Sequence, residues 1–123
     1  MQFSKTNNIY KIIRITGSQD NILGISFAEN PVKIDEIELI EWHNARRGSP
    51  GSGILASKQE VLKQVLVGLE LVNNSFETNY KISKIYFSPD DPIGNRVYAF
   101  LTAKLIRHYH NGYEFKELEN GLK

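Results

Sequence analysis

The sequence predicts one α+β domain, in which two helices pack on one face of a mainly antiparallel sheet of about four strands. Three features predict this class. Segments rich in β-branched residues fill the first third of the chain, an amphipathic helical pattern begins after residue 57, and a strand-like and a helix-like segment then follow. The expected order is β-β-β-α-β-α, and the length of 123 residues suits a single domain spanning residues 1–123.

The first two strands are expected to form a hairpin. Residues 9–16 are rich in β-branched side chains, and residues 22–28 alternate Leu23, Ile25 and Phe27 with small residues. Such alternation is typical of a strand with one buried face. Because the connection between the two segments is short and turn-rich, the strands should lie antiparallel.

A third strand is expected at residues 33–42, after a proline-containing break at residues 30–31. Its alternation is imperfect, because apolar side chains fall on both faces. A fourth strand is expected at residues 80–87. The polar end of the chain, residues 113–123, is either a frayed tail or an edge strand made by Tyr113 and Phe115.

The first helix has a clear start signal, because Ser57 and Glu60 match a capping box. Gly68 lies inside this helix, where glycine costs about 1 kcal/mol relative to alanine, so a closely packed neighbour is expected there. The residues expected on its buried face follow a helical spacing: Val61, Leu62, Val65, Leu66, Leu69, Val72 and Phe76.

The second helix is expected to begin with Asp91 as N-cap and Pro92 at its first position, and to end at Asn111-Gly112. The same cap interpretation accounts for the Asp90-Asp91 pair better than a magnesium site does. Its buried face should carry Ile93, Val97, Phe100, Leu101 and Leu105.

Composition excludes several classes of function. The chain has no cysteine, so it has no disulfide framework and no thiolate metal site. A net charge of +1 gives no sign of nucleic-acid binding through bulk charge, and we expect no direct nucleic-acid partner. No apolar run reaches the length of a membrane span, and the N-terminus lacks the pattern of a secretion signal. These features predict a cytoplasmic protein that does not bind membranes.

The histidines do not predict a metal site. His108 and His110 are two positions apart on the second helix, so their side chains should point in different directions. We therefore expect no metal and no other cofactor.

No complete catalytic set is present, and the chain is expected not to be an enzyme. His43 has no evident nucleophile or orienting carboxylate beside it. The glycine-rich loop that follows Arg46 and Arg47 lacks the phosphate-loop and dinucleotide fingerprints. The alternative that stays open is a small ligand-binding or enzymatic domain in which His43, Arg46 and Arg47 act on an anionic substrate.

Two charged surfaces are predicted. Asp35, Glu36, Glu38 and Glu41 place four carboxylates within seven residues, which suits a basic partner or, equally, a solvated edge that resists aggregation. On the second helix, an outward stripe is suited to an acidic surface or RNA, although amphipathic helices normally have such a face. The stripe comprises Arg96, Ala103, Arg107 and His110, with Lys104 beside it.

The stretch from residue 80 to residue 112, together with the cysteine-free α+β pattern and the acidic strand, resembles the immunity proteins of bacterial contact-dependent growth-inhibition and other polymorphic toxin systems. The resemblance covers about a quarter of the chain. It implies a cytoplasmic protein that binds one cognate toxin C-terminal domain, often a nuclease, and covers its active site.

Our leading hypothesis from the sequence is such a toxin inhibitor. The acidic strand would contact basic groups of the toxin. Tryptophan and arginine, which are enriched at binding hot spots, would contribute further binding free energy. The residues expected to bind the partner are Asp35, Glu36, Glu38, Glu41, Trp42, Arg46 and Arg47.

Overall fold

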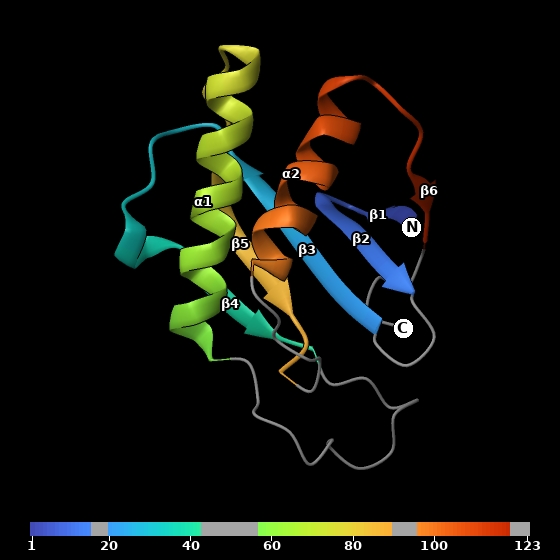
Figure 1. The fold of residues 1–123 in the computed structure, drawn as a ribbon, viewed down its shortest axis with the longest axis horizontal. Helices are drawn as coiled ribbons and strands as arrows, with labels where there is room; N and C mark the ends of the chain where they lie inside the picture. The colour runs from blue at the N-terminus through green and yellow to red at the C-terminus, as the bar shows by residue number, and fades with distance from the viewer. Residues whose placement is uncertain (16–19, 43–56, 90–95, 119–123) are drawn as a thin grey trace.

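The computed structural model describes residues 1–15, 20–42, 57–89 and 96–118 (Figure 1). Its elements follow in the order β1 (Gln2–Thr6), β2 (Ile9–Ile15), β3 (Asp20–Ala28), the 3-10 turn η1 (Ile34–Glu36), β4 (Glu38–Glu41), α1 (Lys58–Phe76), β5 (Lys81–Phe87), α2 (Val97–His110) and β6 (Lys116–Glu117). Figure 1 shows both helices side by side on the same face of the sheet, so the predicted α+β class is confirmed.

The sheet has six strands in the order β4-β5-β3-β2-β1-β6 and is mixed. The prediction of about four mainly antiparallel strands was therefore wrong in number and partly in direction. The central strands pair antiparallel, as the hairpin prediction requires, but β4 runs parallel to β5 and β6 runs parallel to β1. The parallel β4–β5 pair follows from the connection, because α1 lies between the two strands and carries the chain back across the sheet.

The main core lies between the helices and the sheet. One cross-strand row on this face joins Phe3, Ile12, Leu23 and Phe87 through the register of β1, β2, β3 and β5. The side chains that the helices bury against the sheet include Val61, Val65, Leu101 and Leu105. The helix residues and Leu23 match the apolar periodicities of the sequence, which is why this part of the core was predictable, whereas Phe3 lies on a strand that was not predicted.

The two helices approach each other at Gly68, as predicted. A Cβ atom at this position would lie 2.5 Å from the backbone oxygen of Ala99 and 2.8 Å from the Cβ of Thr102. Both distances are too short for a real contact, so glycine allows α1 and α2 to pack directly backbone to backbone.

The helix ends agree with the sequence in part. The Ser57 hydroxyl accepts a hydrogen bond from the Glu60 N–H at 3.2 Å, but the Glu60 carboxylate accepts from the Gln64 side chain and does not complete the predicted box. The end of α2 at Asn111 is confirmed. The predicted first residues of α2, Asp91 and Pro92, lie outside the described residues, and α2 as described begins at Val97.

One predicted strand and one predicted core residue need correction. Residues 34–36 form a 3-10 turn, so only the second half of the expected third strand is β-structure. Phe100, expected on the buried face of α2, is 43% exposed.

In the described part of the chain, neither helix has the length and apolar character needed to cross a bilayer.

Candidate partner-binding surface

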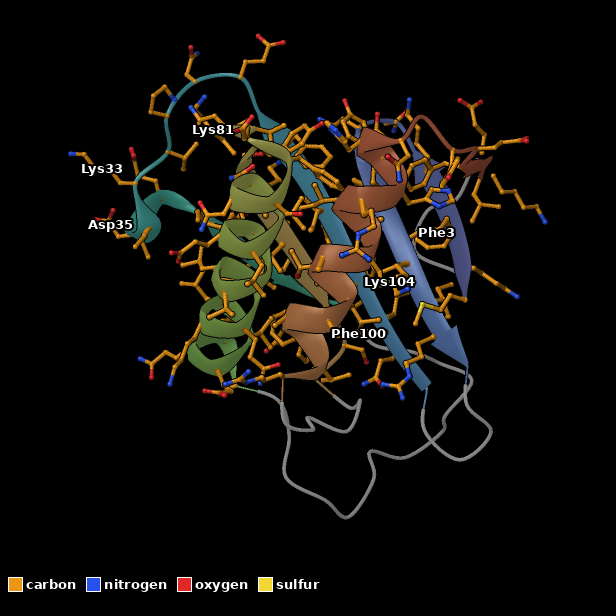
Figure 2. All side chains as sticks on the ribbon, turned by 45° about the horizontal axis from the view of Figure 1, so that its top comes forward. Phe3, Lys33, Asp35, Lys81, Phe100 and Lys104 are labelled. Atoms are coloured by element: carbon orange, nitrogen blue, oxygen red, sulfur yellow. The ribbon has the colours of Figure 1, made fainter. Side chains whose placement is uncertain are left out.

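The four predicted carboxylates lie together on η1 and β4, at one edge of the sheet. We call Asp35, Glu36, Glu38 and Glu41 the acidic segment. All four residues are exposed. Figure 2 shows Asp35 and Lys33 projecting from this edge, away from the helix layer. Because β4 is the terminal strand of the sheet order, the segment forms an outer rim of the sheet.

The backbone of the acidic segment is held by local contacts. The Lys33 N–H donates to the Glu36 carboxylate at 3.0 Å, and the Glu36 N–H donates to the Lys33 carbonyl at 2.9 Å. Ile37 follows directly and is only 8% exposed, so it anchors the turn in the core. The carboxylates are therefore presented by a fixed turn and strand.

The alternation of β4 distributes its charges over both faces of the sheet. Glu38 is in register with Lys84, on the face that the helices do not cover. Glu41 is in register with Phe87, on the helix-covered face. A partner that reached around this edge would meet negative charge on both sides.

Trp42 lies next to the acidic segment but points into the fold. Its backbone N–H donates to the Phe87 carbonyl at 2.7 Å, and the residue is 6% exposed. The ring stacks on Tyr86 with centroids 5.0 Å apart, and a Cβ on Gly24 would lie only 2.6 Å from its edge. The ring therefore braces β4 against the sheet face opposite the helices.

Lys11 shares this second face and is almost completely buried, with its Nζ atom 5.6 Å from the centre of the Trp42 ring. Burial lowers the pKa of Lys11 from its ordinary value, because the charged ammonium loses hydration. The three remaining candidate residues, His43, Arg46 and Arg47, lie outside the described residues.

The two histidines of α2 point to different neighbours. His108 stacks on Phe3 with centroids 3.7 Å apart, whereas His110 stacks on Phe76 at 4.3 Å and bonds through Nδ1 to the Tyr80 hydroxyl at 2.8 Å. They therefore belong to two separate aromatic contacts. Across the described ranges, no group of three acidic, histidine or cysteine side chains has the arrangement of a metal site.

The structure contains an aromatic cluster that the sequence did not predict. Tyr10, Phe27, Tyr80 and Tyr109 come together at the C-terminal end of α2, with neighbouring centroids 4.7 to 5.9 Å apart. Burial raises the pKa of Tyr109, and the nearby Tyr10 and Tyr80 hydroxyls raise it further. No linear spacing could predict this cluster, because each ring comes from a different part of the chain.

The sequence matches no protein-family model. Comparisons with curated proteins and with solved structures also give no significant match.

Proposed function

We propose that the chain is a cytoplasmic immunity protein that binds a cognate bacterial toxin domain and covers its active site, without catalysing a reaction itself. The toxin domain that fits this proposal best is a nuclease, because a nuclease holds phosphate groups with basic side chains. Carboxylates are natural competitors for those side chains. The proposal involves no cofactor, no membrane and no nucleic acid in the inhibitory contact.

The observation that carries the proposal is the exposed acidic segment. Residues 33–41 contain four carboxylates and one lysine, which gives a local charge of −3 in a chain whose net charge is +1. The segment is also rigidly placed by the Lys33–Glu36 turn and by pairing with β5. A fixed patch of one sign steers an oppositely charged partner and orients its docking.

The contribution of these charges should appear mainly in the rate of association. Exposed ion pairs contribute little net affinity, typically about 0.2–1 kcal/mol each, whereas electrostatic steering can raise association rates by roughly 10- to 1000-fold. Inhibition of a toxin inside the cell benefits from fast capture, so this division suits the proposed role.

Growth protection tests the proposal. The chain is co-expressed with the C-terminal toxin domain that the proposal places in the neighbouring upstream gene, and growth is compared with that of cells making the toxin domain alone. We expect full protection by the wild type and weakened protection by the double variant Asp35→Lys/Glu38→Lys. Neither side chain closes the η1 turn, so the variant should fold.

A matched control changes the same charge elsewhere. Glu70 on α1 and Glu114 after α2 are both exposed and lie outside the acidic segment. Glu70→Lys/Glu114→Lys should protect as well as the wild type. Equal protection by both double variants would refute the role of the acidic segment, and no protection by the wild type would refute the proposed function.

A further inference from the structure

A second charged surface, of opposite sign, lies on α2 and the neighbouring strand β2. We call Arg14, Arg96, Phe100, Lys104 and Arg107 the basic face. Arg96, Phe100 and Arg107 are exposed, and Lys104 and Arg14 are partly exposed. Figure 2 shows Phe100 and Lys104 on the side of α2 that looks toward β2 and away from α1. The net charge of +1, from which no direct nucleic-acid partner was expected, therefore conceals a separation of charge across the molecule.

The centre of the basic face is an aromatic ring held among cations. The Arg14 guanidinium carbon lies 5.9 Å from the centre of the Phe100 ring, and the Lys104 Nζ atom lies 5.7 Å from it. The ring is 43% exposed, although it is a large apolar group on a helix that has a buried face available. These contacts hold the ring and two charges together at the surface.

No carboxylate from α2 itself neutralises this charge, because residues 97–110 contain Lys104 and Arg107 but no Asp or Glu. From Arg96 to Arg107 the cations follow about 16 Å of helix, at a rise of about 1.5 Å per residue. Proteins that bind single-stranded nucleic acid combine positive charge along the phosphate backbone with aromatic side chains on which bases stack. The basic face has both kinds of side chain.

We propose that the basic face binds single-stranded nucleic acid, with phosphates on the four cations and a base against Phe100. A phosphodiester chain is favoured over an acidic protein surface, because each cation that meets a phosphate releases a condensed counterion. Isolated carboxylates on a folded protein lack that atmosphere of ions. This inference concerns the chain alone and does not depend on the toxin-binding role of the acidic segment.

Salt dependence gives the first test. Binding of a fluorescein-labelled U12 RNA is followed by fluorescence anisotropy between 50 and 200 mM salt. Four phosphate contacts on a single strand predict a slope of about −2.8 for the logarithm of the binding constant against that of salt, which weakens binding about 50-fold over this range. Lys104→Gln should reduce the slope to about −2.1, and Lys63→Gln on α1 should leave it unchanged.

The aromatic ring gives the second test. Phe100→Ala should weaken binding at least about fivefold while leaving the slope unchanged, because stacking on the ring contributes no counterion release. Phe100→Trp should bind at least as tightly as the wild type, because tryptophan also offers a ring on which a base can stack. The side chain is exposed, so neither variant should compromise folding.

Two further probes identify the class of ligand. T12 DNA that binds like U12 supports nucleic acid in general, and weaker T12 binding narrows the class to RNA. Binding of a twelve-residue polyglutamate with the affinity of U12 would overturn the proposal in favour of an acidic protein. Absence of U12 binding at 50 mM salt, or Phe100→Ala binding as well as the wild type, would also overturn it. Growth protection by the same chain would be unaffected by any of these results.

Discussion

Replacement of Gly68 by alanine tests the packing that places the two helices on the sheet. Alanine should stabilise α1 by about 1 kcal/mol through helix propensity. The new Cβ would meet the Ala99 backbone oxygen at 2.5 Å and the Thr102 Cβ at 2.8 Å, so the helices must separate by several tenths of an ångström. Overpacking of this kind costs about 1–3 kcal/mol, and a backbone contact belongs in the upper part of that range.

The net expectation for Gly68→Ala is a loss of about 1–2 kcal/mol in the free energy of unfolding. For a chain of this size, an unfolding entropy of about 0.26 kcal/mol/K converts the loss to a Tm lowered by about 4–8 °C. Urea denaturation followed by circular dichroism measures the free energy directly. The control is Asn74→Ala, at an exposed position on the same helix, which should be neutral or slightly stabilising. An unchanged or higher stability of Gly68→Ala would refute the close approach of the helices.

Three further predictions concern the second sheet face, the α1–β5 connection and the aromatic cluster. Gly24→Ala would place a Cβ 2.6 Å from the Trp42 ring, so the emission of this sole tryptophan should move to longer wavelength; an unchanged spectrum would contradict the placement of the ring. Asn73→Ala should lower the free energy of unfolding by about 1–3 kcal/mol, because the Asn73 side-chain amide accepts from the Thr78 hydroxyl and the Tyr80 N–H and donates to the Tyr80 carbonyl. Equal stability of the variant and the wild type in urea would show that these hydrogen bonds contribute nothing. The raised pKa of Tyr109 means that the native state keeps the phenol proton to higher pH than the unfolded state, so the contribution of this group to stability is present below pH 10 and is lost as pH rises through the native pKa. Tyr109→Phe should therefore reduce the fall in unfolding free energy between pH 9 and pH 11. An identical fall in the wild type and the variant would argue against the raised pKa.

The parts of the fold that the sequence predicted are those set by local pattern. The cap at Ser57 needs only the residues that follow it, and the close approach at Gly68 was indicated by a glycine in a strong helical pattern. The strand alternation of Leu23, Ile25 and Phe27 likewise carries its own information. Each of these signals can be recognised within one turn or one strand.

The strands that were missed or only partly predicted depend on distant partners. β1 is polar on one face and is recognisable as a strand only because β2 lies beside it. β6 is the edge strand that was one of two expectations for the tail, but it forms at Lys116–Glu117 and not at Tyr113 and Phe115. The neighbouring Leu118 N–H donates to the Lys5 carbonyl at 2.9 Å, so the position of β6 is set by residues more than a hundred places away. The direction of β4 depends on how α1 returns the chain to β5.

The candidate site shows the same division. The acidic segment was evident from four closely spaced carboxylates, but the turn at Lys33–Glu36 that fixes it was not. Trp42 was expected to contribute binding energy to a partner contact. In the structure its ring is buried in the space beside Gly24, which lies on β3, so the sequence around Trp42 could not reveal this burial. The cations around Phe100 similarly combine β2 with α2, which no single segment reveals.

The most direct measurement of the proposed function is the rate at which the chain associates with the purified toxin domain that the proposal assigns to it, recorded by stopped flow at 50 and 500 mM salt. The steering account predicts a rate constant that falls at least about tenfold at the higher salt, and a comparable fall at low salt in Asp35→Lys/Glu38→Lys but not in Glu70→Lys/Glu114→Lys. Identical rates for all three proteins at both salt concentrations would contradict the claim that this chain recognises its partner through the acidic segment.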